Sequence, residues 1–300
     1  MHIQKHITCI TEKLMPTLHD KIVCNQYAWW LLEHLTQKTK TDLIIQSQIE
    51  LDEHQEKLLQ TWINQIVNEH KPIAYILGNV PFGDLTINVK PPVLIPRPET
   101  EQWIIDLIEQ IKKSNAQKLQ ILDLCTGSGC IALLLAHELP DAIVYALDIA
   151  DEAIALAQQN ASLHNIKNLH IITSDLFEQL PNITFDIIVT NPPYIGTSEK
   201  LDTSVIAWED KRALFADDNG IALIQKIIEQ APVYIHENEI LQQQNIGQLY
   251  IEIGWQQGQD VKKLMQKNQY TAITIEKDSA SKDRVVSGRI NNVAIAGNKK

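Results

Sequence analysis

Residues 123–132 read Asp-Leu-Cys-Thr-Gly-Ser-Gly-Cys-Ile-Ala, and the fold that the sequence implies is organised around this stretch. An apolar run at 120–124 leads into the glycine loop, and an apolar helical segment follows it. Small residues in such a loop let a ligand approach the backbone closely. The spacing Gly127-x-Gly129-x-x-Ala132 satisfies the fingerprint of a dinucleotide-binding turn. The stretch therefore predicts a strand, a ligand-binding loop and a helix.

Asp148 stands where this fingerprint calls for an acidic residue. It lies 21 residues after Gly127, at the end of the second expected strand. A carboxylate there can bind the ribose diol of a dinucleotide or of an adenosyl cofactor. The loop and Asp148 predict a nucleotide-containing cofactor without identifying it, and an NAD-dependent oxidoreductase remains open at this point.

Strands and helices alternate from residue 119 to the end of the chain, which specifies an α/β fold with a mostly parallel sheet covered on both faces. The expected strands are 120–124, 142–147, 169–173, 185–190 and 248–253. The expected helices are 129–138, 151–164, about 220–230 and about 257–267. Two final strands, 272–276 and 284–290, are joined by a polar turn.

The first part of the chain differs in character. Apolar residues recur at helical spacing before residue 70, and Asp52 is an expected helix N-cap. Glycines, prolines and short alternating runs then predict a β-hairpin. We expect a helical bundle domain at 1–75, a β-hairpin linker at 76–96, and the α/β domain at 97–300, which opens on a helix.

Composition restricts the class of protein. A net charge of −11 over 300 residues argues against a broad nucleic-acid footprint. No apolar run reaches the ~18 residues of a membrane span, and the N-terminus has no signal-peptide core. The four cysteines match no zinc pattern or disulfide framework. We expect a cytoplasmic monomer with reduced thiols, no metal, and no direct nucleic-acid or membrane partner.

Thr190-Asn191-Pro192-Pro193-Tyr194 directly follows a buried apolar run and indicates the chemistry. The two prolines fix the backbone, so that their carbonyls become rigid acceptors. An Asn amide, these carbonyls and an aromatic face can hold a planar NH2 group. Acceptors aimed at its hydrogens favour the pyramidal, positively charged nitrogen that develops when the nitrogen attacks a methyl group. Hydride transfer needs no such arrangement, so the stretch favours methylation of an amide or an exocyclic amine.

With these residues assembled, the sequence resembles the class I S-adenosylmethionine-dependent methyltransferases, and within them the release factor glutamine N5-methyltransferases (the PrmC/HemK family). The resemblance covers nearly the whole chain. It is carried by the helical N-terminal domain, the glycine loop, Asn191–Tyr194, and residues 72–78, 96–101, 254–258 and 283–289. It implies the Rossmann-like sheet of that fold, with an antiparallel last strand.

The resemblance also implies the reaction. S-adenosylmethionine is the cofactor and S-adenosylhomocysteine its product, and the substrate is the Gly-Gly-Gln glutamine of class 1 peptide chain release factors, so the enzyme supports translation termination. The resemblance makes Asn191, Pro192 and Tyr194 the catalytic residues, and together with Pro193 the substrate-binding residues. The cofactor-binding residues that it implies are Cys125, Thr126, Gly127, Ser128, Gly129, Asp148, Leu176 and Asn191.

Three positions depart from the family pattern. Cys125 replaces a glycine, and Cys-Thr-Gly-Ser-Gly-Cys also occurs in the sister enzymes that methylate a glutamine of a ribosomal protein. Leu176 replaces an aromatic residue, which weakens adenine stacking, and Asp210 replaces a proline. Residues 97–101 and 254–258 favour the release-factor branch. Methylation of the sister substrate, adenine-N6 methylation of nucleic acid, and a non-catalytic adaptor that retains the fold are the alternatives.

Overall fold

The computed structural model describes residues 2–290, and the chain divides into two compact units. The helical unit comprises Met1–Asn79 and Leu201–Trp208, and the sheet unit comprises Val80–Lys200 and Glu209–Lys300. The sequence did not predict that residues 201–208 belong to the helical unit. The domain boundaries that the sequence suggested, at residues 75 and 96, stay a prediction. No helix of the described part is long and apolar enough to cross a bilayer.

The helical unit is built around one apolar cluster, to which Leu59, Ile63 and Ile66 contribute as the helical spacing predicted. Asp52 caps the fourth helix by accepting from the Gln55 N–H, and the Gln55 side chain accepts from the Asp52 N–H in return. This reciprocal cap satisfies two donors that a helix start otherwise leaves free. The helices are α1 (Ile3–Leu18), α2 (Lys21–Thr36), α3 (Lys40–Gln46), α4 (Glu53–Glu69) and α5 (Ile73–Leu77).

Helix α9 (Thr203–Trp208) joins this unit from the middle of the sequence. The Trp208 indole Nε1 donates to the Glu69 carbonyl at 2.8 Å, and the Lys71 ammonium lies 5.2 Å from the centre of the Trp208 ring. Such a pair of a hydrogen bond and a cation–π contact holds one face of an aromatic ring. Sequence periodicity did not predict this helix, because six residues are too few to show it.

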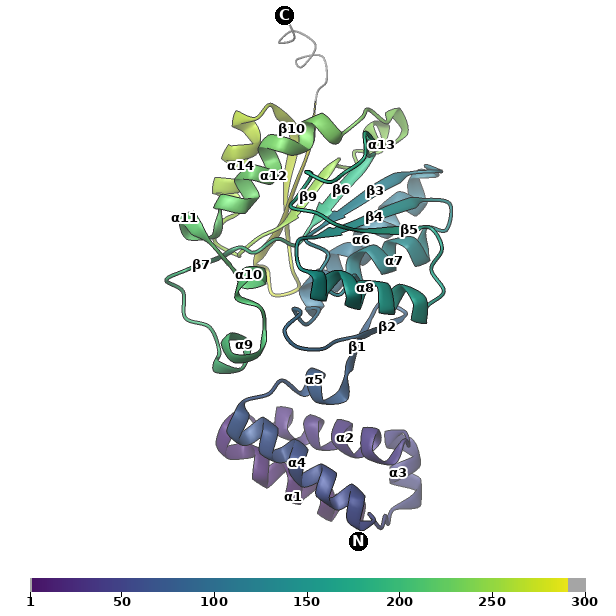
Figure 1. Ribbon diagram of the computed structural model, residues 1–300, viewed down its shortest axis with the longest axis vertical. Coiled ribbons are helices and arrows are strands. Elements are labelled where there is room, and N and C mark those ends of the chain that lie inside the picture. The colour runs from purple at the N-terminus through teal and green to yellow at the C-terminus, as the bar shows by residue number, and fades with distance from the viewer. Residues whose placement is uncertain (1, 291–300) are drawn as a thin grey trace, which may run out of the picture. The chain divides into compact units, whose positions relative to one another are not determined.

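The sheet unit contains a seven-stranded sheet in the order β10-β11-β9-β6-β3-β4-β5 (Figure 1). Strand β3 pairs in parallel with β4 and β6, whereas β11 is antiparallel to both β9 and β10. The predicted mostly parallel sheet with an antiparallel last strand is confirmed. The strands are β3 (Gln120–Leu124), β4 (Ile143–Asp148), β5 (Leu169–Thr173), β6 (Ile187–Thr190), β9 (Leu249–Glu252), β10 (Tyr270–Lys277) and β11 (Asp283–Ile290).

Helices cover both faces of this sheet (Figure 1). On one face lie α6 (Pro98–Ser114), α7 (Cys130–Glu138) and α8 (Asp151–Leu163); on the other lie α12 (Ala222–Gln230) and α14 (Gly258–Lys267). Ile224, Ile227 and Met265 of the second pair are fully buried against the strands. Since neighbouring parallel strands end at the same edge, the residues that follow β3, β4 and β6 are brought together there.

Several short elements complete the sheet unit. The expected hairpin is present as a small two-stranded sheet, formed by β1 (Asn79–Phe82) and β2 (Leu85–Asn88). The sequence did not predict the short helices and strands that follow β6, because each is too short to show a hydrophobic period. They are β7 (Ile195–Gly196), α10 (Lys211–Leu214), β8 (Phe215–Ala216), α11 (Asp217–Gly220), η1 (Ala231–Tyr234) and α13 (Glu239–Gln243).

Candidate active site

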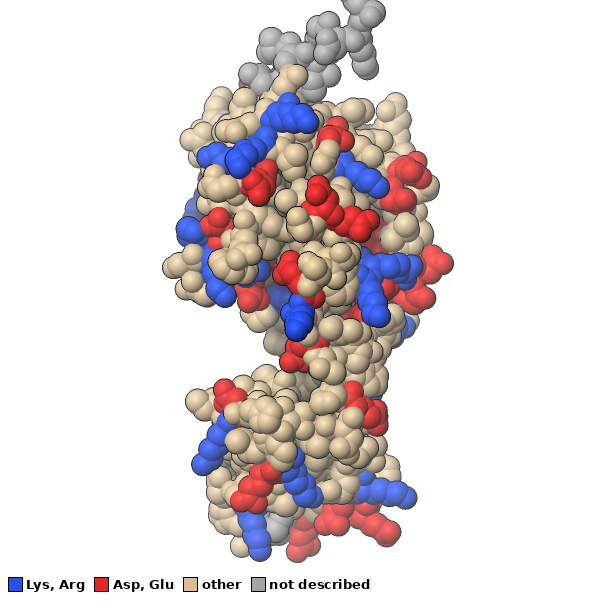
Figure 2. All heavy atoms as spheres, turned by 90° about the vertical axis from the view of Figure 1, so that its left-hand side faces the viewer, with Lys and Arg blue, Asp and Glu red and all other residues tan. Residues whose placement is uncertain are grey.

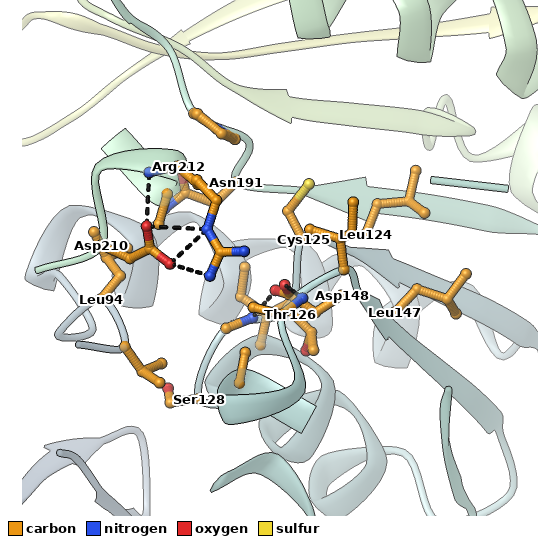
Figure 3. A pocket seen from close by; sticks show the side chains of 18 of the residues that line it. Leu94, Leu124, Cys125, Thr126, Ser128, Leu147, Asp148, Asn191, Asp210 and Arg212 are labelled. Atoms are coloured by element: carbon orange, nitrogen blue, oxygen red, sulfur yellow. Dashed lines mark hydrogen bonds and ion pairs between the residues drawn. The ribbon is translucent and has the colours of Figure 1, made fainter. Parts of the chain in front are cut away.

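A cavity of about 290 Å³ lies in the sheet unit at the carboxyl ends of β3, β4 and β6 (Figure 3). The segment before α6 and helix α10 contribute further parts of its wall. This is the place in an open α/β sheet where ligands bind. Eight of the site residues predicted from the sequence line it: Cys125, Thr126, Gly127, Ser128, Asp148, Leu176, Asn191 and Pro193.

Three further predicted residues, Gly129, Pro192 and Tyr194, are not among those that line the cavity. Gly129 begins α7 with φ +83°, and a Cβ on it would lie 3.0 Å from the Ala157 Cβ, so this glycine allows the helices to pack. Pro192 is buried, and the Tyr194 hydroxyl donates to Glu252 at 3.4 Å. Contact of Gly129 with a cofactor, and of Pro192 and Tyr194 with a substrate, stays a prediction.

Asp148 holds the glycine loop against the end of β4. Its Oδ2 accepts from the Gly127 N–H at 2.9 Å and its Oδ1 accepts from the Ala150 N–H at 3.0 Å. Burial raises the pKa of Asp148, and these backbone donors oppose the rise. A carboxylate has about four acceptor sites, so Asp148 can still accept from a ligand hydroxyl.

Unpaired polar groups lie beside this loop. Within the described residues, Ser128 Oγ and Asp123 Oδ1 are buried without a hydrogen-bond partner, while Asp123 Oδ2 accepts from Thr126 Oγ1 at 2.6 Å. Burial raises the pKa of Asp123 to about 7. Buried polar atoms without partners are uncommon in folded proteins. Of these residues Ser128 lines the cavity, as Asp148 does, and their oxygens fit a ligand that carries hydroxyl and amine groups, as an adenosyl amino-acid cofactor does.

Leu176 and Asp175 form the wall that follows β5. Leu176 adopts φ +48°, and the Ser174 hydroxyl donates to its carbonyl at 2.7 Å, so a tight turn presents the side chain. A half-buried leucine beside an exposed carboxylate can cover one face of a purine and meet its amino group. Contact of Leu176 with adenine stays a prediction.

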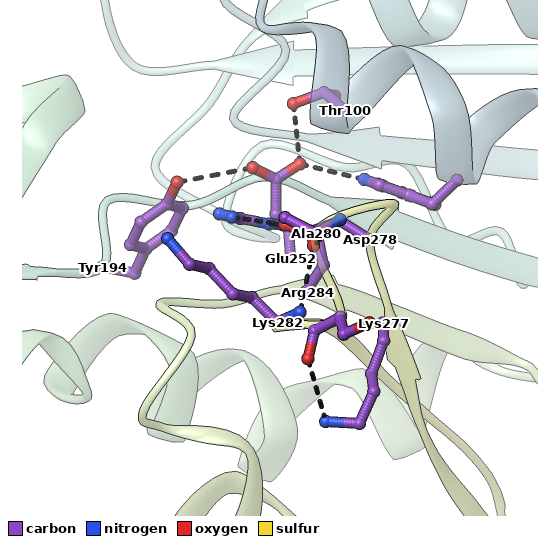
Figure 4. A network of polar contacts seen from close by, with 10 residues as sticks. Thr100, Tyr194, Glu252, Lys277, Asp278, Ala280, Lys282 and Arg284 are labelled. Atoms are coloured by element: carbon purple, nitrogen blue, oxygen red, sulfur yellow. Dashed lines mark hydrogen bonds and ion pairs between the residues drawn. The ribbon is translucent and has the colours of Figure 1, made fainter.

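Asn191 is held by a polar network that the sequence did not predict, and Figure 4 shows the part of it around Thr100, Glu252 and Tyr194. Its Nδ2 donates to Thr100 Oγ1 at 3.2 Å, and Thr100 Oγ1 donates to Glu252 Oε2 at 2.7 Å. The Trp103 Nε1 donates to the same carboxylate oxygen at 2.9 Å. The only signal in the sequence was the glutamate that follows an apolar run, because an acidic residue in a buried strand needs polar partners. Glu252 is buried at the end of the apolar strand β9.

An ion pair joins the start of α6 to the segment after β6. Arg97 contacts both Glu209 oxygens at 2.7 Å, and the Glu209 side chain is only 1% exposed. Next to it, the Asp210 N–H donates to the Pro92 carbonyl at 2.7 Å, a hydrogen bond that proline cannot make. Asp210 also caps α10 by accepting from the Arg212 N–H. The departure from the family pattern at this position therefore adds contacts to the cavity wall.

Arg97→Met is expected to lower the free energy of unfolding by about 3 kcal/mol at neutral pH, because it leaves a buried carboxylate without its partner. Burial already raises the pKa of Glu209, and Arg97 opposes that rise. In the variant the folded state binds this proton more tightly than the unfolded state, so stability falls as pH rises through the raised pKa. Urea unfolding at pH 5 and pH 7 should therefore show the larger loss at pH 7.

Lys113→Met is the matched control for this experiment. Lys113 pairs with Glu109 one helical turn away, and both side chains are exposed. Exposed pairs of this kind contribute little, so this variant should unfold as the unmodified protein does at both pH values. An Arg97→Met variant that behaves like the control would contradict the role given to the buried pair.

Comparisons with known proteins agree with this arrangement. Residues 106–209 match the Methyltransferase small domain family, and residues 25–78 match the PrmC N-terminal domain family. A release factor glutamine methyltransferase of Flavobacterium psychrophilum is 37% identical over 95% of this chain and 98% of its own. Relatives with the same name from Lactococcus lactis and Escherichia coli are 41% and 37% identical, over 78% and 86% of this chain and 83% and 90% of their own.

Proposed function

The chain belongs to the release factor glutamine methyltransferases, and from this premise we propose which reaction it performs and which residues perform it. A methyl group passes from S-adenosylmethionine to the N5 amide nitrogen of the Gly-Gly-Gln glutamine of a class 1 peptide chain release factor. This modification supports translation termination. The observation that carries the proposal is the position of Asn191, which follows β6 and lines the same cavity as the glycine loop.

The cofactor supplies an electrophilic methyl group when it is bound. Asp148 binds the ribose hydroxyls, and residues 125–128 form the wall behind the rest of the molecule. Leu176 covers the adenine ring. Among the described residues, no three or more His, Cys, Asp or Glu side chains gather in a group that could bind a metal ion.

Asn191 and the Pro192 carbonyl act on the substrate amide, which is a poor nucleophile because its lone pair is delocalised. As the nitrogen attacks, it becomes pyramidal and positively charged, and acceptors aimed at its hydrogens then bind it more strongly than before. Tyr194 lies against the glutamine side chain and limits its movement. Alignment of the nitrogen with the methyl group supplies the remaining acceleration.

The alternative substrates differ in charge and size. Adenine-N6 methylation would call for a basic surface, but the net charge is −11 and acidic and basic side chains are interspersed on the face that Figure 2 shows. Methylation of a ribosomal protein glutamine uses the same chemistry. The names of the relatives favour the release factor over that protein.

The test is to incubate the purified protein with S-adenosylmethionine and a release factor, and then to locate the methyl group by mass spectrometry. We expect it on the glutamine of the Gly-Gly-Gln peptide. Methylation of a ribosomal protein alone would assign the chain to the sister activity. Salt-sensitive methylation of DNA or RNA would instead support the adenine alternative.

Asp148→Asn is expected to raise the dissociation constant for S-adenosylmethionine about 10- to 100-fold, as for loss of a charged hydrogen-bond partner. Asparagine keeps one acceptor oxygen for the loop but presents a donor where the ribose hydroxyls bind. Isothermal calorimetry measures the change directly. Asp141→Asn, on the turn before β4 and outside the cavity wall, is the control; equal cofactor affinity in both variants would remove Asp148 from the site.

The remaining parts of the proposal concern the whole chain. We assign the helical domain to 1–75, the hairpin linker to 76–96 and the methyltransferase domain to 97–300. The protein acts in the cytoplasm, where release factors are found, as a monomer, and without nucleic acid or membrane as a partner.

A further inference from the structure

We propose that Glu252 is a positioning residue which, through Thr100, fixes the orientation of the Asn191 amide. This inference rests on the function proposed above, because it concerns which end of Asn191 meets the substrate. Glu252 itself is buried at the end of β9 and is not part of the cavity wall. Its effect on the reaction therefore passes through its neighbours.

The first step is the direction of the hydrogen bond between Thr100 and Glu252. The Trp103 indole N–H can only donate, so its partner at 2.9 Å, Glu252 Oε2, must be an acceptor. Thr100 Oγ1 lies 2.7 Å from this same oxygen. A hydroxyl has a single proton, and because Glu252 Oε2 accepts, Thr100 must donate that proton in the hydrogen bond that Figure 4 marks.

The second step concerns the other side of Thr100. Having donated its proton, Thr100 Oγ1 offers only lone pairs, so it selects the NH2 end of the Asn191 amide, which lies 3.2 Å away. The oxygen end is then free of protein partners among the described residues, in a side chain that lines the cavity. Substrate methylation requires an acceptor at that end. With the amide turned round, the Asn191 NH2 would face the substrate NH2, and two donors repel.

The third step is that the orientation of the Asn191 amide is the same whether Glu252 is charged or protonated. Burial raises the pKa of Glu252, and the Trp103 and Thr100 hydrogen bonds oppose the rise. A proton taken up by this group would reside on Oε1, which faces the Tyr194 hydroxyl at 3.4 Å. Oε2 remains an acceptor in both forms, so Thr100 keeps its direction.

A matched pair at Thr100 tests the relay. Thr100→Val keeps the shape of the side chain but removes the hydroxyl, and Thr100→Ser keeps the hydroxyl. With a Gly-Gly-Gln release factor as substrate, we expect Thr100→Val to lower kcat about 10- to 100-fold, as for misplacement of a reacting group. The cofactor dissociation constant should stay within about threefold, and Thr100→Ser should retain kcat within about threefold, because the hydrogen-bond geometry survives. Unchanged kcat in Thr100→Val, or a loss confined to cofactor affinity, overturns the proposal.

A second pair separates the acceptor from the charge of Glu252. In Glu252→Gln the amide oxygen can face Trp103 and Thr100 while its NH2 faces Tyr194, so kcat should remain within about threefold. Glu252→Leu offers no acceptor and should lose kcat as Thr100→Val does. It also leaves the Trp103 N–H unsatisfied, so its melting temperature is measured alongside. A Gln variant as inactive as the Leu variant overturns the proposal.

The Asn191 amide itself gives a readout that needs no substrate. Its two side-chain N–H signals, assigned by their loss in Asn191→Asp, are followed by NMR in the 15N-labelled protein. We expect them to shift and exchange faster with water in Thr100→Val and in Glu252→Leu, but not in Glu252→Gln. Asn191 signals that are unchanged in all three variants overturn the proposal. A protein that methylates no release factor but shows the expected signals contradicts only the proposed function.

Discussion

Asn191→Ala is expected to lower kcat about 100- to 1000-fold, the range found when one preorganised polar group is removed from a transition state. The substitution takes away the side-chain acceptor, while the Pro192 carbonyl alone remains for the substrate amide. Asn191 is half-buried at the cavity wall, so its truncation opens no core cavity. Steady-state methylation of a release factor measures kcat, and calorimetry of the apo protein should give a nearly unchanged melting temperature.

Asn168→Ala is the matched control, because it should do the reverse. Asn168 donates to the carbonyls of Ala136, Leu139 and Ala142, away from the cavity wall. Its loss leaves acceptors without partners and should lower the free energy of unfolding by about 1–3 kcal/mol. Methylation below the melting range should then proceed at the ordinary kcat. If Asn191→Ala also retained that rate, the assigned role of the Asn-Pro-Pro-Tyr stretch would be wrong.

Gly220→Ala is expected to have the largest effect on the shape of the site. A Cβ at this position would lie 1.9 Å from the Tyr194 carbonyl oxygen and 2.8 Å from Gln257 Nε2. The backbone there has φ +85°, which costs a non-glycine residue about 1–2 kcal/mol. Overpacking adds about 1–3 kcal/mol. Gln257 Nε2 holds that same carbonyl by a 2.8 Å hydrogen bond, so the clash must displace residues 193 and 194.

We therefore expect Gly220→Ala to lower the free energy of unfolding by about 3 kcal/mol and kcat at least tenfold, since ångström-scale misplacement costs rate. Gly78→Ala is the control: it has φ +79°, but no atom within 4 Å of the added carbon. It should show only the cost of the conformation, about 1–2 kcal/mol, with kcat unchanged. Equal effects of the two substitutions would show that the contact with Tyr194 is unimportant.

The sequence predicted those parts of the fold that are periodic and long. Strands β3 and β5 begin and end where their apolar runs predict. Residues 121–124 of β3 are buried, as in a central parallel strand, whereas β5 is an edge strand whose Leu169, Ile171 and Ile172 are half-buried. The glycine loop and Asp148 were predicted for a related reason: a tight turn between a strand and a helix restricts residue type at fixed spacing.

The polar network and the short turns after β6 could not be predicted in the same way. Thr100, Trp103 and Glu252 meet through hydrogen bonds that span about 150 residues, and no local pattern relates them. No local pattern relates Gly220 to Tyr194 either, although the two are in close contact. These contacts are set by tertiary packing, which a single sequence does not reveal.

The excursion of residues 201–208 has a consequence for the order of folding. The hydrogen bond from Trp208 to Glu69 closes a loop of 139 residues, and the ion pair from Arg97 to Glu209 closes one of 112. Closing a long loop costs conformational entropy, and the contacts that compensate for this cost form only after the loop is closed. The adjacent residues Trp208 and Glu209 thus belong to different units. Both units can form most of their contacts before these two long-range contacts are made. In time-resolved hydrogen exchange, the segment that carries these anchors should acquire protection last.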